Sequence, residues 1–181
     1  IGWTAASSWL CVRVFSGIDG MDTLAIVLAA CVCAIFCSDL LSGVVHWAFD
    51  RYGNEKIPVL GPGFIKPFRD HHTDPQGICG HSFVETNGNA CIACTPLLVV
   101  GLLLDPSAHL FWASLCFGTS IGVFMTNQFH SWAHEPSPPR VAVLLQRSGL
   151  ILNPAHHDQH HSGSFDSNYC ITNGWMNPLM E

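Results

Sequence analysis

The sequence predicts an all-α, multi-pass membrane protein whose helices carry a histidine-rich, cytosolic di-metal cap. The first reason is composition, because 49% of the residues are hydrophobic and only 11% are charged, against about 25% charged in an ordinary soluble domain. The second is that long uncharged stretches recur along the chain. The third is that ten of the eleven histidines gather in tight groups at the edges of these stretches. A net charge of −6 gives no basic footprint for a nucleic acid, so we expect no nucleic-acid partner.

Three segments are long and apolar enough to be membrane spans. Residues 23–45 contain one charged residue, Asp39, and would form a helix of roughly 34 Å, which is enough to cross the hydrocarbon layer. Residues 86–104 and 107–129 carry no charged residue apart from the titratable His109. Because only Asp105 and Pro106 separate these two segments, we expect a transmembrane hairpin. The sequence therefore predicts one membrane domain over residues 23–181.

Residues 1–22 form a separate N-terminal segment in this interpretation. Its first twelve residues are uncharged but short, and they fit the end of a span, an interfacial piece or a disordered lead. Because the chain opens at Ile1 rather than at methionine, we expect a truncated sequence whose natural start lies upstream. The apolar segment Val141 to Leu152 is too short to cross a bilayer upright, so we expect it at the interface or against the catalytic loops.

The order of spans predicts that all the histidine groups emerge on one membrane face. The first span ends at His46, the loop after it carries further histidines, and the hairpin returns the chain to the same side before His130. The loops on this side also carry six of the seven Lys and Arg residues, whereas the Asp105-Pro106 turn has none, so the positive-inside bias makes this face cytosolic. Asp39 lies close to His46 in the same span, which favours a role at the site over an unpaired membrane charge.

The spacing of the histidines indicates a metal site. His130 and His134 are four residues apart, as are His46 and Asp50, so each pair stands on one helix face and can converge on one ion. The same offset occurs twice in residues 156–161. Eight or more imidazoles exceed what one ion with about four to six ligands takes, so two metals are predicted. A zinc hydrolase needs only about three protein ligands, so this larger number of histidines favours two irons that activate dioxygen. For the isolated His109 we expect a satisfied polar position in the core.

Five ordered motifs from about Asp39 to the C-terminus resemble the Kua family of plasmanylethanolamine desaturases, which includes bacterial CarF proteins and plant plastid desaturases. The stretch Phe83 to Gly88 makes the chain more similar to the ether-lipid branch than to the plant branch. The motifs are His46-Trp47-Ala48-Phe49-Asp50, Pro67-Phe68-Arg69-Asp70-His71-His72, Phe83-Val84-Glu85-Thr86-Asn87-Gly88, Thr126 through His134, and His157-x-x-His160-His161 through Tyr169-Cys170-Ile171-Thr172.

The resemblance implies an oxygen-dependent di-iron oxidoreductase that converts 1-O-alkyl ethanolamine phospholipid into the vinyl-ether plasmalogen. It implies two iron ions, dioxygen as co-substrate and a cytochrome b5-type electron donor. The compartment would be the endoplasmic reticulum in a eukaryote or the inner membrane in a bacterium. No residue is assigned to substrate binding. The implied iron ligands are His46, His71, His72, His130, His134, His157, His160 and His161, and we expect Asp50, His81, His156 and Asp158 to orient them.

Three other functions fit parts of the pattern. An acyl-lipid desaturase or hydroxylase could use the same irons, because the metal site alone does not set which bond reacts. A histidine-rich membrane metal transporter or sensor would need ligands along a pathway between spans. A metal-stabilised scaffold without turnover would not consume oxygen.

Overall fold

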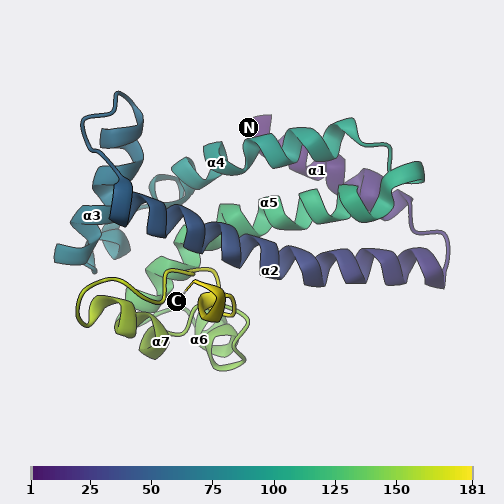
Figure 1. Cartoon of the computed structure of the whole chain (residues 1–181). Helices are drawn as coiled ribbons and strands as arrows, with labels where there is room; N and C mark the ends of the chain where they lie inside the picture. The colour runs from purple at the N-terminus through teal and green to yellow at the C-terminus, as the bar shows by residue number, and fades with distance from the viewer. Residues whose placement is uncertain (1, 181) are drawn as a thin grey trace. The chain divides into compact units, whose positions relative to one another are not determined.

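The structure, a computed structural model, describes residues 2–180, and every regular element in that range is a helix (Figure 1). The predicted all-α class is therefore confirmed. Helices α2, α4 and α5 are each long and apolar enough to cross a membrane, as expected for a multi-pass membrane protein. The elements are α1 (Gly2–Ser16), α2 (Met21–Tyr52), η1 (Gly61–Ile65), α3 (Lys66–Thr73), η2 (Gly77–Gly80), α4 (Phe83–Leu103), α5 (Pro106–His134), α6 (Arg140–Arg147), α7 (Pro154–His161) and η3 (Asn177–Leu179).

The three helices begin and end close to the predicted spans. The span predicted over 23–45 lies within α2, the one over 107–129 lies within α5, and only Leu104 of the span over 86–104 falls outside α4. Helix α2 continues for seven residues beyond the predicted end. Its 32 residues make a helix of roughly 48 Å, longer than the roughly 30 Å hydrocarbon layer. The extra turns carry His46 and Asp50 on the same continuous helix.

One compact unit comprises the residues up to Ser38 together with Ala90–Phe124. The core of this unit includes Leu10, Val14 and Leu98. It lies between α1, the first half of α2 and the apolar parts of α4 and α5. The Arg13 guanidinium donates to the carbonyl oxygens of Leu102 (2.6 Å) and Leu104 (2.7 Å), which would otherwise be unpaired at the end of α4. The N-terminal segment, for which the sequence left three possibilities open, is thus a helix packed into this core.

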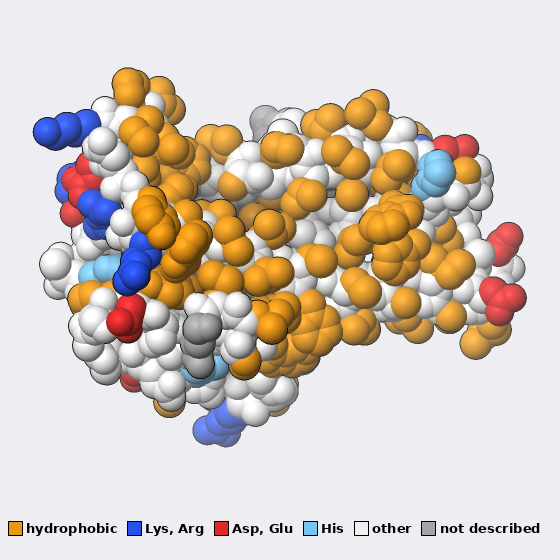
Figure 2. Space-filling model, viewed as in Figure 1, with side chains coloured by type: hydrophobic (Ala, Val, Ile, Leu, Met, Phe, Trp, Pro, Cys, Tyr) orange, Lys and Arg blue, Asp and Glu red, His pale blue; other side chains and the backbone are white. Residues whose placement is uncertain are grey.

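The outward faces of these helices are apolar. Leu28, Val32, Ile92 and Trp112 are all more than half exposed, and Figure 2 shows hydrophobic side chains covering much of the visible surface. In water such a surface would drive aggregation, whereas lipid chains cover it at no cost. His109, expected in the core, is exposed in the first turn of α5, so that expectation is wrong. At a helix start the imidazole reaches solvent and needs no buried partner.

A second compact unit comprises Asp39–Asn89 and Met125–Glu181, of which the structure describes the residues up to Met180. It contains α3, α6, α7 and the histidine-bearing ends of α2 and α5. Ala133, Leu152 and Ile171 form its buried apolar cluster, with Phe68 packed against them. The short apolar segment expected near residues 141–152 begins as α6, whose Gln146 donates to the Trp132 carbonyl oxygen at 3.1 Å. This contact holds α6 against the end of α5.

Close packing between α2 and α5 depends on Gly118, and its replacement by leucine tests this. A Cβ atom at position 118 would lie 2.8 Å from the Ala34 Cβ atom, so Gly118→Leu should lower the free energy of unfolding by about 1–3 kcal/mol through overpacking. Thermal unfolding of detergent-purified protein measures this. Gly88→Ala is the control, because a Cβ atom there meets nothing within 4 Å in helix α4. Equal melting temperatures for both variants would contradict the packing account.

Candidate metal centre

Four helices of the second unit deliver histidines to one place. The end of α2 brings His46 and Asp50, α3 brings His71 and His72, the end of α5 brings His130 and His134, and α7 brings the remaining three. They form two groups in which all donor atoms lie within 4.8 Å of one another. The five-histidine group is His71, His130, His134, His157 and His161, and the four-donor group is His46, Asp50, His72 and His160.

Helix periodicity explains how the donors divide. Residues four apart share a helix face, so His130 and His134 enter one group, as do His157 and His161. Consecutive residues point about 100° apart around a helix, so the neighbours His71 and His72 enter different groups. The same rotation separates His160 from His161.

In the five-histidine group the ring nitrogens converge without other partners. The Nε2 atom of His130 lies 2.8 Å from Nε2 of His157 and 3.2 Å from Nε2 of His134, and Nε2 of His161 lies 3.1 Å from that of His157. The buried Nε2 of His71 has no hydrogen-bond partner among the described residues. A metal ion with nitrogen ligands at about 2.1 Å holds adjacent donors about 3 Å apart. Since neutral imidazole has a single N–H, five converging rings are poorly satisfied without a cation.

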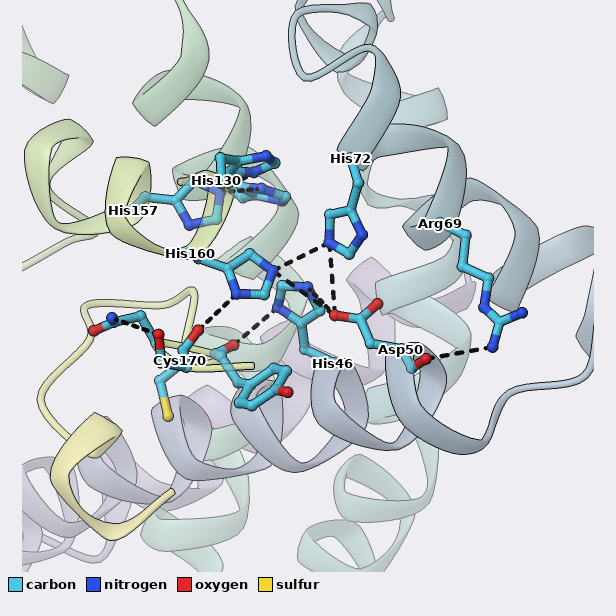
Figure 3. A network of polar contacts seen from close by, with 12 residues as sticks. His46, Asp50, Arg69, His72, His130, His157, His160 and Cys170 are labelled. Atoms are coloured by element: carbon cyan, nitrogen blue, oxygen red, sulfur yellow. Dashed lines mark hydrogen bonds and ion pairs between the residues drawn. The ribbon is translucent and has the colours of Figure 1, made fainter. Parts of the chain in front are cut away.

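The four-donor group combines three imidazoles with a carboxylate (Figure 3). An Asp50 oxygen lies 3.1 Å from Nε2 of His46, 3.6 Å from that of His72 and 3.7 Å from that of His160. The Asp50 side chain is 6% exposed, and within residues 2–180 neither carboxylate oxygen accepts a conventional hydrogen bond. A buried carboxylate in this state is costly unless a cation neutralises it. We expected Asp50 to orient a ligand, and the structure places its carboxylate among the donor atoms.

Backbone carbonyl groups orient two of these rings. The Nδ1 atom of His46 is 3.0 Å from the Tyr169 carbonyl oxygen, and Nδ1 of His160 is 2.7 Å from that of Ser167. A carbonyl oxygen can only accept, so each Nδ1 carries the proton and each Nε2 keeps a free lone pair for a metal. The Arg69 guanidinium donates to the Asp50 carbonyl oxygen at 3.3 Å and links α3 to the end of α2.

The five histidines of the two donor groups that lie outside the candidate spans are neutral at neutral pH. Burial, reinforced by the neighbouring imidazoles, lowers the pKa of His71 to about 2 and that of His160 to about 3. The same causes lower the pKa of His161 to about 4 and that of His157 well below its ordinary value. Burial also lowers the pKa of His72, against the opposing effect of the Asp50 carboxylate. Neutral imidazole is the form that binds a metal ion.

Asp39 holds the C-terminal segment that supplies these carbonyl groups. Its carboxylate is fully buried, and one oxygen accepts from the backbone N–H groups of Thr172 (3.1 Å), Asn173 (2.8 Å) and Gly174 (3.0 Å). The other oxygen accepts from the N–H of Met176 at 2.9 Å. Four N–H donors replace the water that a carboxylate loses on burial. Asp39 therefore joins α2 to the segment containing Ser167 and Tyr169, consistent with the expectation that it serves the site.

Two of the residues expected to orient ligands lie beside cavities. His81 is exposed and lines a cavity together with His71 and His130, and in the described part of the chain it makes no hydrogen bond or ring contact with another histidine. Asp158 is exposed and lines a second cavity with His134. The tautomer-fixing role predicted for these two residues stays a prediction.

His156 supports the C-terminal segment. Its Nε2 atom lies 2.9 Å from Oδ1 of Asn168 and 3.4 Å from Nδ2 of Asn177. Gly174, with a φ of 83°, lies so close that a Cβ atom there would be 2.8 Å from the His156 ring. His156 therefore acts on the segment that orients His46 and His160 rather than on a ligand ring.

Residues 35–181 match the family defined by the lipid desaturase domain. The chain is 44% identical to a plasmanylethanolamine desaturase of Myxococcus xanthus, with 84% of this chain and 55% of that protein aligned. It is 36% identical to plasmanylethanolamine desaturase 1 of Mus musculus, with 86% and 60% aligned. It is 37% identical to the chloroplastic fatty acid desaturase 4 of Arabidopsis thaliana, with 80% and 45% aligned.

The chain spans about half the length of these relatives, between 45% and 60%. No solved structure matches the chain with significant similarity. The family match covers residues 35–181 and therefore includes every histidine of the two groups.

Removing one donor from each group tests the division into two groups. His134→Ala removes a donor from the five-histidine group and His46→Ala removes one from the four-donor group, so each should lower the bound metal from about two ions per chain to about one. Elemental analysis of purified protein measures this. His109→Ala is the matched control, because His109 is exposed and belongs to neither group. Full metal content in both site variants would refute the two-group arrangement.

Asp39→Asn tests the anchor of the C-terminal segment. The amide keeps one acceptor oxygen but turns an N–H donor toward a backbone N–H and removes the charge, so the free energy of unfolding should fall by about 1.5–3 kcal/mol. Thermal unfolding and limited proteolysis between residues 163 and 177 report the loss. Asp22→Asn, an exposed acid at the start of the same helix, should change stability by less than about 0.5 kcal/mol. Indistinguishable behaviour of the two variants would rule out the anchor.

Proposed function

The chain belongs to the lipid desaturase family, and we propose that it is an oxygen-dependent di-iron desaturase that converts 1-O-alkyl ethanolamine phospholipid into the vinyl-ether plasmalogen. The observation that carries the proposal is the pair of donor groups, eight imidazoles and one carboxylate, to which the ends of the membrane-length helices α2 and α5 and the short helices α3 and α7 contribute. The two aligned relatives with 44% and 36% identity are named plasmanylethanolamine desaturases.

The reaction removes one hydrogen from each of C1 and C2 of the alkyl chain and forms a double bond between them. The two electrons and two protons taken from the lipid, together with two electrons from a donor protein and two protons from solvent, reduce dioxygen to two water molecules. Two iron ions, when bound, supply the activation of dioxygen that abstraction from an unactivated C–H bond requires. We assign a cytochrome b5-type protein as electron donor and the cytosol as the face to which the site opens.

The residues of the chain orient the metal ligands and exclude water from the site. The His46 and His160 rings are fixed through their Nδ1–H groups by the backbone of the C-terminal segment, so that both Nε2 atoms face the Asp50 carboxylate. His46, His157 and His160 are almost fully buried, which excludes water that would compete with the alkyl chain for the oxidant.

Imidazole is also a good ligand for zinc and copper. Iron is favoured because a redox-inert zinc site needs about three protein ligands, whereas the chain offers nine donors in two groups.

Acyl-lipid desaturation is the second candidate, and one observation favours it. The chain is 37% identical to a chloroplastic fatty acid desaturase 4 over 80% of its length, and the donor groups alone do not choose which C–H bond reacts. A metal transporter would need ligands placed one after another along the spans, but the donors form two closed groups in one compact unit.

A lipid analysis separates the two desaturase candidates. Cells that contain 1-O-alkyl ethanolamine lipids but no plasmalogens would express the full-length protein, and acid-labile vinyl ethers would be measured by mass spectrometry. We expect vinyl ethers with the wild-type protein, and at least about a hundredfold less with His130→Ala or Asp50→Ala because a metal donor is lost. His109→Ala should retain wild-type activity.

New acyl double bonds without vinyl ethers would replace the proposal with the second candidate. Vinyl-ether formation by His130→Ala at the wild-type rate would sink the metal assignment.

A further inference from the structure

A cavity of about 430 Å³ leads to the five-histidine group in the second unit. His71 and His130 form part of its wall, together with Phe64, Phe68 and Ile78. We propose that this cavity binds the reacting end of the lipid's alkyl chain, an inference that rests on the proposed function. Its size falls in the range of about 300–1,000 Å³ typical of small-molecule sites.

The lining combines polar and apolar side chains. Asp70, His81 and Glu85 line the cavity and are exposed, so they form its rim. His71 and His130 are buried, and the phenylalanine side chains of the lining are half-buried. A polar rim together with apolar lining suits an amphipathic ligand whose polar end stays at the rim while its chain enters. In the proposed reaction C1 and C2 are the chain atoms nearest the polar glycerol, so only a short apolar path is needed.

The cavity opens where a membrane span begins. Thr86 and Asn89, three residues apart on one face of the first turns of α4, line it. On the adjoining side of the same turns, Phe83 is 51% exposed and Val84 is 76% exposed. Large exposed apolar side chains at the start of a candidate span lie against lipid or its interface. A lipid chain can therefore reach the cavity from the bilayer along α4.

The cavity also indicates which donor group the chain meets. Two members of the five-histidine group line it, and none of the four-donor group does. A second cavity, of about 460 Å³, touches the same five-histidine group through His134 and is lined by Gln76 and Asp158, while Asp74 lines both cavities. Its lining is more polar than that of the first cavity, which suits water or a small polar reactant. The five-histidine group thus has one apolar and one polar approach.

Two tryptophan substitutions in one loop distinguish these approaches. Ile78 faces the first cavity and Gln76 the second, and this loop is tied to α5 by the Cys79 thiol, which lies 3.5 Å from the Ser131 carbonyl oxygen. With the full-length protein and a 1-O-alkyl ethanolamine phospholipid in vesicles, we expect Ile78→Trp to raise KM or lower turnover at least about tenfold by filling the chain site. Metal content should stay at the wild-type level. Gln76→Trp should keep KM within about twofold.

A binding experiment keeps the inference testable even if turnover is absent. The same phospholipid with a photoreactive diazirine near C2 of its alkyl chain would be crosslinked to the wild-type protein and mapped to single residues by mass spectrometry. Labelling of Phe64, Ile78 or Thr86 is the expected result, and Ile78→Trp should abolish it. Labelling of Gln76 or Pro154 instead, or a KM and a turnover that both stay at the wild-type values in Ile78→Trp, would overturn the chain site.

If the wild-type protein forms no vinyl ethers but Ile78 is labelled, the proposed reaction is wrong and the chain site stands. The two proposals therefore fail separately.

Discussion

Nine side chains that could hold a metal ion are brought together by the fold, and this constraint shapes the second unit. Eight of them are imidazoles and one is the Asp50 carboxylate, and the donor atoms of each group lie within 4.8 Å of one another. Packing so many lone pairs together in a medium of low dielectric constant costs free energy that hydrogen bonds between neutral rings cannot recover. Bound cations would recover it, so we expect metal binding and folding of this unit to be coupled.

Hydrogen bonds elsewhere in the unit keep these donors from moving apart. Helix α2 carries His46 and Asp50, and seven residues before His46 it carries Asp39, which accepts four backbone N–H groups from the C-terminal segment. That segment returns two carbonyl oxygens to His46 and His160. One acid in a membrane-length helix thus fixes the orientation of rings that are more than a hundred residues apart in sequence.

Much of this arrangement could be predicted from the sequence, because it depends on helix periodicity and on the order of spans. A hairpin between two spans returns the chain to its starting side, and residues four apart share a face, so the convergence of the histidines follows from simple geometry. Whether His81 binds a metal or orients a ligand could not be decided this way, since an isolated histidine in a loop has no periodic partner. The exposure of His109 was not predicted, because a polar side chain in the first turn of a helix can reach water even where the surrounding sequence is apolar.

Two features depend on contacts that no sequence pattern reveals. The partners of Asp39 are backbone N–H groups, which every residue but proline has, so only the path of the chain identifies them. The position of Asp50 among the donors depends on the approach of α3 and α7, which bring His72 and His160 to within 4 Å of its carboxylate.

We propose that the chain holds two irons in different ligand environments, one of nitrogen donors only and one that includes a carboxylate. Mössbauer spectroscopy of purified protein grown on isotopically enriched iron tests it most directly. The account predicts two iron components of equal area, with the Asp50→Asn variant altering only one of them. A single iron component, or protein that retains zinc in place of iron at full activity, would contradict it.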